Sequence, residues 1–384
     1  MLRWSISRSP ESPAKPTAAP SRPWNSRLTC ILADTHFSVK LQAPKKAAVA
    51  SSQGPSKIFH RLGPSRLGSA WREHLSTNYY LTERGNMKIS FVGLGQMGKH
   101  MAMNMLKSGA ELTVADLRKD VFPQFERKGV RTTTNLAEVA QADIVFLSLP
   151  GTQAVQDVLV GPSGIIDKLG KGQIVVDLST MSYTATLELA KSLEARGVSF
   201  LDAPISGMEA RAQEGTLTVM CGGSEKTLET VRPYLNCIGN KILYMGGTGS
   251  GQLTKLINQL LFDINAAALA EVLPMAVKLG LDPEKVGQVV NSGTGKSYAS
   301  EFFLPRILKN SFSDGYAMKH AYKDLVSGAE ISANLCIPMP VLGAATATYQ
   351  AALLKGYGDQ DKGAMIRVFE ELLGVAYRDN SSKQ

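Results

Sequence analysis

Cysteine is scarce in this chain of 384 residues, and its four cysteines are scattered. Cys30, Cys221, Cys237 and Cys336 form no C-x-x-C pair. Such spacing predicts neither a metal site nor a disulfide framework, and it is typical of a protein from a reducing compartment.

Long apolar runs are also missing. The best candidate for a membrane span, residues 256–279, is interrupted by Asp263, Glu271 and Pro274. A spanning helix needs about 20 predominantly apolar residues, so we expect no membrane segment.

Net charge is absent from most of the chain. Residues 1–86 hold 13 Lys and Arg against 4 Asp and Glu, so the whole excess of +9 lies there, and residues 87–384 are balanced. A balanced body argues against a nucleic-acid-binding face. The alternative is a protein that binds nucleic acid through the basic residues 1–86. In that case binding should depend on salt and should disappear when residues 1–86 are deleted.

Residues 1–86 differ from the rest in composition. They contain all three tryptophans and 8 of the 18 prolines, with no sustained period of 2 or 3.6. We expect most of this stretch to be disordered and outside the working enzyme. Its Arg-rich, Ser-rich, acid-poor composition fits an organelle transit peptide and a mitochondrial matrix location. The alternative is that translation starts at Met87, which favours a cytoplasmic protein.

A glycine-rich turn follows the first predicted strand. Residues 89–92 are mostly apolar, and Gly93, Gly95 and Gly98 follow at G-x-G-x-x-G spacing. The first glycine permits a sharp turn, the second lets a pyrophosphate approach the backbone, and the third lets the next helix pack closely. That helix is predicted to run to Gly109, with its N-terminus facing the phosphates.

Asp116 ends the second predicted strand, residues 111–115, 21 residues after Gly95. An acidic residue at about this distance binds an adenosine ribose hydroxyl. Its charge disfavours a 2′-phosphate, so we expect NAD, although Arg118 leaves NADP possible. The alternative is a turn aspartate without a ligand.

Strands and helices alternate as far as residue 250. This alternation predicts an α/β fold with a Rossmann-type, doubly wound parallel sheet over residues 87–250. Further strands are expected at 130–133, 144–149, 173–178, 199–201, 217–221 and 242–245, and further helices at 119–128, 136–140, 151–159, 182–196 and 224–235.

The pattern changes after the glycine-rich segment 246–251. No strand is predicted beyond it, and Pro274 is expected to kink the first long helix. Residues 251–384 are therefore predicted to form an all-α C-terminal domain for substrate binding and subunit packing. Its helices are expected at 252–279, 283–292, 301–309, 317–334, 339–355 and 363–373.

Two stretches carry candidate chemistry. Lys255, Asn258 and Gln259 share one helix face at i+3 and i+4 spacing. A lysine can act as a general acid when its pKa is lowered toward neutrality, and the alternative is a solvated helix face. Residues 202–207 end a predicted strand, where successive N–H groups and the Ser206 hydroxyl could bind a carboxylate. The alternative there is an ordinary turn.

Four stretches together resemble the β-hydroxyacid dehydrogenase family: Gly93–Gly98, Asp202–Gly207, Gly249–Gln259 and Lys323–Leu325. The resemblance implies reversible hydride transfer between NAD(P) and a small carboxylate substrate, in a homodimer or homotetramer. It implies Lys255 as the catalytic acid/base, and Ser206, Gly207, Asn258 and Gln259 as substrate-binding residues. The residues it implies for the cofactor are Gly93, Leu94, Gly95, Gln96, Met97, Gly98, Asp116, Leu149, Pro150, Thr180 and Lys323.

Two departures from the family pattern concern the substrate. The family's substrate stretch usually reads Ser-Gly-Gly, and here Met208 replaces the last glycine. The catalytic stretch often ends in Asn-Asn, and here it ends in Asn258-Gln259. Asn-Gln resembles the tartronate semialdehyde (2-hydroxy-3-oxopropionate) reductase branch more than the 3-hydroxyisobutyrate branch. The alternative from another class is a catalytically silent dinucleotide-binding module.

Overall fold

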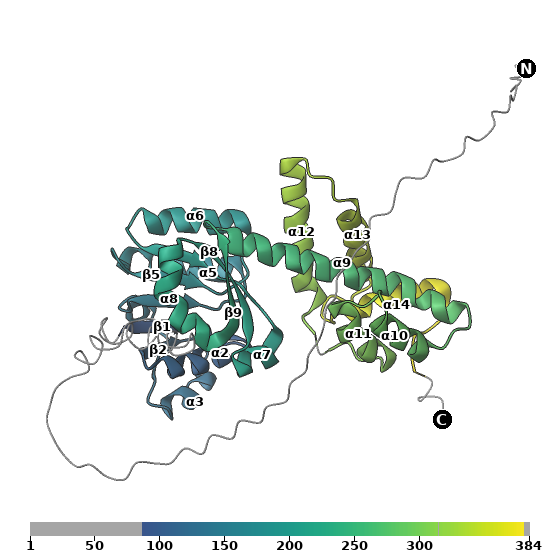
Figure 1. Ribbon diagram of the computed structural model, residues 1–384, viewed down its shortest axis with the longest axis horizontal. Helices are drawn as coiled ribbons and strands as arrows, with labels where there is room; N and C mark the ends of the chain where they lie inside the picture. Colours follow the sequence, from purple (N-terminus) through teal and green to yellow (C-terminus); the bar gives the residue numbers. More distant parts are fainter. Residues whose placement is uncertain (1–86, 314, 380–384) are drawn as a thin grey trace, which may run out of the picture. The chain divides into compact units, whose positions relative to one another are not determined.

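The computed structural model describes residues 87–313 and 315–379. The expected N-terminal extension, residues 1–86, lies outside the described residues. Within the described part, a sheet with flanking helices is followed by a helical region, as the sequence predicts (Figure 1).

Six strands form the parallel part of the sheet, in the order β3-β2-β1-β4-β5-β6. All four residues of β4 and of β5 are buried, because helices cover both faces of the sheet. The strands are β1 (Lys88–Val92), β2 (Glu111–Ala115), β3 (Arg131–Thr133), β4 (Ile144–Leu147), β5 (Ile174–Asp177) and β6 (Ser199–Asp202).

The far edge of the sheet departs from the expected all-parallel arrangement. Strand β8 (Leu217–Gly223) pairs antiparallel with β6, and β9 (Gly239–Gly246) runs parallel to β8. Strand β7 (Ile205–Ser206) and helix α7 (Met208–Glu214) were not predicted, because the stretch is short and its apolar residues follow no clear period.

Local signals set several helix ends. The side chain of Asn135 accepts a hydrogen bond at the start of α4, and Ser182 does so for α6. The expected helix at 119–128 is instead a 3₁₀ turn, Lys119–Val121, followed by a short α3, since Pro123 interrupts it. The helices of this half are α2 (Gly98–Met105), α3 (Pro123–Glu126), α4 (Leu136–Val139), α5 (Thr152–Val160), α6 (Tyr183–Glu194) and α8 (Glu225–Ile238), with 3₁₀ turns at Leu106–Ser108 and Ile166–Lys168.

The helical region is built on α9 (Ser250–Lys278), which is continuous through Pro274. After Gly246 the described residues contain no strand. The other helices, whose side chains form one apolar core with those of α9, are α10 (Pro283–Ser292), α11 (Tyr298–Leu308), α12 (Met318–Leu335), α13 (Pro340–Leu354) and α14 (Ile366–Leu373), with a 3₁₀ turn at Lys362–Met365.

Helix α9 is the one helix of the described residues that is long and apolar enough to cross a membrane. Its interior face carries Asp263, which is fully buried and paired with the buried Lys362. Leu260 and Leu273 on the same helix belong to the protein's own apolar core.

Candidate functional site

The glycine-rich turn joins β1 to α2, and its glycines have different roles. A side chain at Gly93 would place its Cβ 2.2 Å from the Ser148 carbonyl oxygen, and one at Gly98 would place it 1.9 Å from the Gly93 carbonyl oxygen. Gly95 has nothing within 4 Å of the same position. The first and third glycines are therefore required by the turn itself, whereas the space at Gly95 is open to a ligand.

Asp116 lies at the end of β2 against this turn. Its carboxylate accepts hydrogen bonds from the main-chain N–H of Leu94 at 2.6 Å and of Arg118 at 2.8 Å. The Arg118 guanidinium lies 3.7 Å from the same carboxylate. Asp116 thus braces the turn, a role that the sequence did not indicate.

A cavity of about 660 Å³ opens over the turn. Most of the predicted cofactor residues line it, together with Arg118. Leu94 does not, because its side chain is buried in the core beneath. The predicted lining residues are Gly93, Gly95, Gln96, Met97, Gly98, Asp116, Leu149 and Pro150.

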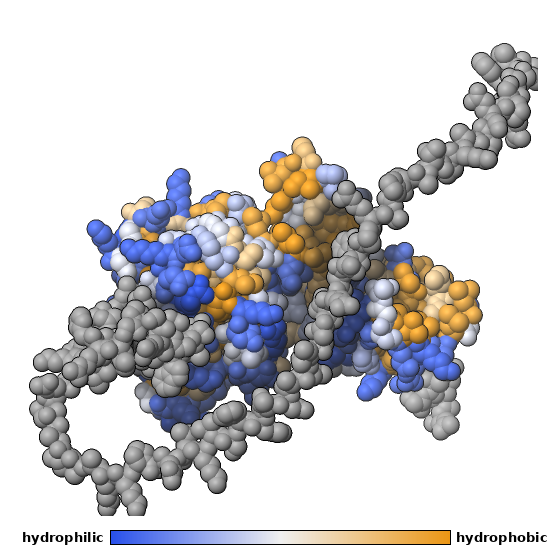
Figure 2. Space-filling view, in the orientation of Figure 1, coloured by the Kyte–Doolittle hydropathy of each residue, from blue (hydrophilic) through white to orange (hydrophobic). Residues whose placement is uncertain are grey.

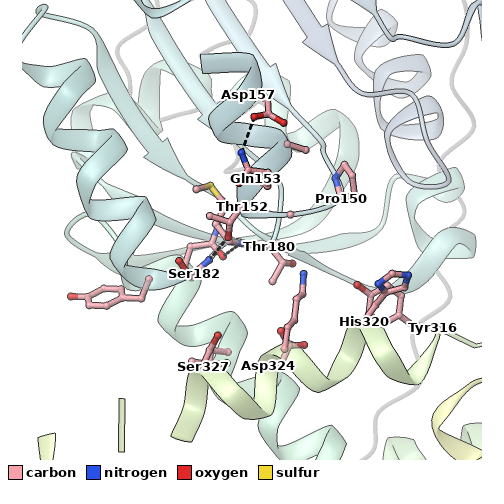
Figure 3. A pocket seen from close by; sticks show the side chains of 17 residues that line it. Pro150, Thr152, Gln153, Asp157, Thr180, Ser182, Tyr316, His320, Asp324 and Ser327 are labelled. Carbon is pink, nitrogen blue, oxygen red and sulfur yellow. Dashed lines mark hydrogen bonds between the residues drawn. The ribbon is translucent and has the colours of Figure 1, made fainter. Parts of the chain in front are cut away.

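A second cavity, of about 530 Å³, adjoins the first, since Pro150, Ala154 and Asp157 line both. Thr180 and Lys323, the two remaining cofactor candidates, line this second cavity. In Figure 3, Thr180 and Ser182 on the sheet side face Asp324 and Ser327 of α12. Ten of the eleven predicted cofactor residues therefore line one or other of two adjoining cavities.

Lys255 is buried near the start of α9, with 9% of its surface exposed. Burial lowers the pKa of its ammonium from 10.5 to about 8, the Asp324 carboxylate acts in the opposite direction, and Lys362 lowers it further. Among the described residues, none makes a hydrogen bond or ion pair with its ammonium. The alternative of a solvated lysine is therefore wrong.

The neighbours of Lys255 differ in exposure. Gln259 is half-buried and donates a hydrogen bond to Asp324 at 3.4 Å. Asn258 is exposed and contacts Gln259 at 3.5 Å. The Lys255 side chain itself lines neither cavity, but Gln252 and Leu256 on either side of it line the second one, as does Asp324.

The stretch around Ser206 and Gly207 is not an open turn. Ser206 pairs with Thr218 of β8 in the short strand β7, and Gly207 has a φ of 145° before α7 begins. Both residues are half-buried. Neither lines either of these two cavities, and the Ser206 hydroxyl makes no hydrogen bond within the described part of the chain.

Asp202, Gln252 and Asp324 were not singled out as site residues from the sequence. The buried Asp202 carboxylate accepts hydrogen bonds from the main-chain N–H groups of Gly249 and Gln252, at 2.7 and 3.0 Å. The Gln252 side chain in turn bonds the main chain at Ser179 and Met181. The signal that the sequence offered was the polar Gln252 at the start of the long, mostly apolar helix.

Two family models match this chain, one after the other along the sequence. Residues 88–246 match the family model for the NAD-binding domain of 6-phosphogluconate dehydrogenase, and residues 249–369 match that for the NAD-binding domain of NADP-dependent 3-hydroxyisobutyrate dehydrogenase.

Curated relatives cover most of the chain. The chain is 38% identical over 293 residues to 2-(hydroxymethyl)glutarate dehydrogenase of Eubacterium barkeri, covering 76% of this chain and 97% of that protein. It is 33% identical to 2-hydroxy-3-oxopropionate reductase of Escherichia coli, with 74% and 97% covered. Relatives named as mitochondrial match at 31% identity.

A solved structure has the same fold. The crystal structure of 3-hydroxyisobutyrate dehydrogenase from Salmonella typhimurium superposes with a TM-score of 0.67 at 28% identity, over 74% of this chain and 100% of that one.

Proposed function

The chain belongs to the β-hydroxyacid dehydrogenase family and is an NAD(P)-dependent oxidoreductase acting on CH–OH groups, and we propose that it acts on a short β-hydroxyacid. The preferred substrate in the reductive direction is 2-hydroxy-3-oxopropionate, which Asn258-Gln259 supports. 3-Hydroxyisobutyrate is the second candidate. The similarity to 2-(hydroxymethyl)glutarate dehydrogenase adds a third.

The single observation that carries this proposal is the buried Lys255. With a pKa of about 8, Lys255 is present both as ammonium, which can give a proton, and as neutral amine, which can take one, near neutral pH. It is coupled electrostatically to Asp324 and Lys323, both of which line the second cavity.

The two adjoining cavities support the binding of a dinucleotide. The first cavity would hold the adenosine and pyrophosphate, with Gly95 leaving room for phosphate oxygens and Asp116 beside the ribose. The second cavity would hold the nicotinamide between Thr180 and Lys323. The carboxylate of Asp116 repels a 2′-phosphate and supports a preference for NAD, with NADP still accepted.

The chain's own residues handle the proton. When bound, the nicotinamide accepts the hydride in oxidation and supplies it in reduction. Neutral Lys255 accepts the proton of the substrate hydroxyl as the carbonyl forms. In the reverse direction its ammonium stabilises the growing alkoxide and returns the proton to that oxygen.

Polar groups near Lys255 would hold the substrate. Ser206 and Gly207 supply a hydroxyl and a main-chain N–H for the carboxylate, and the Asn258 and Gln259 amides bind a substrate hydroxyl or carboxylate without adding charge. The Asp324 carboxylate faces Gln259. That contact would fix the Gln259 amide so that it presents its oxygen to the substrate hydroxyl.

The domain division follows the site. We assign residues 87–250 to cofactor binding and residues 251–384 to substrate binding and oligomerisation. Residues 1–86 are assigned to no part of the catalytic unit. We favour a cytoplasmic location, with the mitochondrial matrix as the alternative if residues 1–86 are a transit peptide; subcellular localisation of a fluorescently tagged full chain tests this.

Exposed apolar side chains on α9 support a homodimer. Ile257, Leu261, Val272, Met275 and Leu279 are each more than half exposed and repeat at helical spacing along one side. The opposite side of α9 carries the apolar core. A matching stripe on a second copy of this chain is the occupant that would cover it in the dimer or tetramer.

The connection between α12 and α13 carries further exposed apolar side chains. Leu335, Ile337, Met339 and Val341 are exposed there, and Figure 2 shows apolar surface over the ends of these two helices (Figure 2).

The role of the α9 stripe in subunit packing is tested by a V272D/M275D variant, which should sediment as a monomer. An unchanged sedimentation coefficient would remove α9 from the interface.

The proposed activity is tested by cofactor turnover on a panel of acids. Glycerate (the reduction product of 2-hydroxy-3-oxopropionate), 3-hydroxyisobutyrate and 2-(hydroxymethyl)glutarate are compared with NAD and with NADP. We expect the largest kcat/KM for glycerate with NAD. Absence of turnover on all three acids would contradict the proposal.

A further inference from the structure

Met208 has an unfavourable backbone conformation for a residue with a side chain. Its φ is 61°, in the left-handed region, and it follows Gly207 with a φ of 145°. Consecutive positive φ values favour glycine, because a Cβ crowds the following carbonyl in this region. A side chain at 208 therefore persists only where its surroundings hold it.

The Met208 side chain is held by Tyr298. The Tyr298 hydroxyl donates a hydrogen bond to Met208 Sδ at 2.8 Å, although the two residues are 90 apart in the sequence. Tyr298 is the first residue of α11, so the contact joins the β7–α7 turn to the helical region. Met208 is 40% exposed and Tyr298 is 56% exposed, so both side chains are in contact with solvent.

Tyr298 in turn packs on the face of α9 that carries Lys255. Its ring meets the Phe262 ring edge to face, with centroids 5.6 Å apart. Phe262 lies two turns beyond Lys255 and one turn beyond Gln259, so these three residues share one side of α9. The side chains Met208, Tyr298 and Phe262 thus form a continuous wall, which begins next to Gly207 and ends on the side of Lys255.

We propose that the Met208–Tyr298 pair determines substrate specificity by limiting the substituent on the α-carbon of the acid. The inference rests on the proposed function. Glycerate, 3-hydroxyisobutyrate and 2-(hydroxymethyl)glutarate all have the form HOCH₂–CH(R)–COO⁻, with R a hydroxyl, a methyl or a carboxyethyl group. Lys255 engages the hydroxymethyl end and Ser206 and Gly207 engage the carboxylate, which leaves R to face the wall.

The chemistry of the wall favours a compact R. The Lys362 ammonium lies 4.1 Å from the centroid of the Phe262 ring, but it is buried and paired with Asp263. The thioether and the two aromatic rings therefore offer no free cation to a second carboxylate, and burying an unpaired carboxylate is costly. The hydrogen bond between Met208 and Tyr298 also holds the two side chains together, so a longer R cannot pass between them. The chain should therefore prefer hydroxyl and methyl substituents and discriminate against carboxyethyl.

The experiment compares kcat/KM on 2-(hydroxymethyl)glutarate and 3-hydroxyisobutyrate in the full chain. Met208→Gly removes the side chain and should raise the ratio of the two values by on the order of tenfold or more, because a pocket change of this size alters discrimination by about that factor. Tyr298→Phe removes the hydrogen bond alone and should raise the ratio by less. Met208→Leu keeps the bulk but loses the sulfur acceptor, so it should raise the ratio only as much as Tyr298→Phe does.

The possible failures can be told apart. If the wild-type enzyme is active and Met208→Gly and Tyr298→Phe both show its kcat/KM ratio within about twofold, the specificity role of the wall is wrong. The proposed function would still stand. Wild-type inactivity on all three acids would overturn both. If the melting temperature of Met208→Gly falls, Met208→Ala gives the same comparison, since it removes the thioether and keeps the β-carbon.

Discussion

The carboxylate of Asp202, at the end of β6, accepts a hydrogen bond at 3.0 Å from the main-chain N–H of Gln252, 50 residues further along the chain. The same carboxylate caps Gly249, so it fixes the first turn of the helix that carries Lys255. The fit is tight, because a Cβ on Gly222 or Gly251 would lie within 2.8 Å of this side chain.

We predict that Asp202→Asn lowers kcat for oxidation and destabilises the fold. An asparagine keeps one acceptor and turns an NH₂ toward an N–H donor, which leaves a buried donor without a partner, at a cost of about 1–3 kcal/mol. Urea unfolding and steady-state kinetics measure the two effects. Asp167→Asn is the control, since Asp167 forms an exposed ion pair with Arg196. Equal stability of the two variants would refute the anchoring role.

The pH dependence of the two directions should be opposite. Burial lowers the pKa of Lys255 to about 8. Oxidation requires the neutral amine, so its kcat/KM should rise about tenfold per pH unit below that value and level off above it. Reduction requires the ammonium, so its kcat/KM should be constant below pH 8 and fall above it. Parallel profiles for the two directions would contradict the assignment.

The glycines of the turn should separate folding from cofactor binding. Gly98→Ala forces Cβ against the Gly93 carbonyl and should destabilise the fold by about 1–3 kcal/mol or more. Gly95→Ala meets no atom within 4 Å and should leave the melting temperature unchanged. It should nevertheless raise the Kd for NAD by on the order of tenfold, because the methyl group occupies the space of the pyrophosphate. Scanning calorimetry gives the melting temperature of each variant, and titration calorimetry gives its Kd for NAD. A wild-type Kd for NAD in Gly95→Ala would count against the cofactor site.

Asp116→Ala should reduce the preference for NAD over NADP. A hydrogen bond to a charged group contributes about 1.5–3 kcal/mol, so the ratio of the two kcat/KM values should fall on the order of tenfold. Because Asp116 also braces Leu94, a thermal melt accompanies the measurement. Asp120→Ala, in the exposed segment after β2, is the matched control. An unaltered ratio in Asp116→Ala would remove this residue from the choice of cofactor.

Local signals carried most of the fold prediction. The spacing of Gly93, Gly95 and Gly98 and the alternation of short apolar strands with helices act over a few residues each, so the sequence displays them directly. The candidate site residues were predicted from the family resemblance, because the sequence around Lys255 alone is also compatible with a solvated helix face.

The missed features depend on distant residues. Strand β7 forms because β8 offers it an edge, and β8 reverses direction to pair with β6. The bond from Asp202 to Gln252 and the contact between Met208 and Tyr298 each join segments that only the folded chain brings together. Nothing in the local sequence reports such contacts.

The account as a whole depends on Lys255 as the group that exchanges the proton with substrate. Its most direct test is kcat for oxidation in Lys255→Ala, measured beside the Kd for NAD. We predict that kcat falls by on the order of 10²–10⁴ while NAD binding stays close to wild type. Lys278→Ala, at the exposed far end of the same helix, should retain full activity. A Lys255→Ala enzyme that turns over as fast as the Lys278→Ala control would contradict the account.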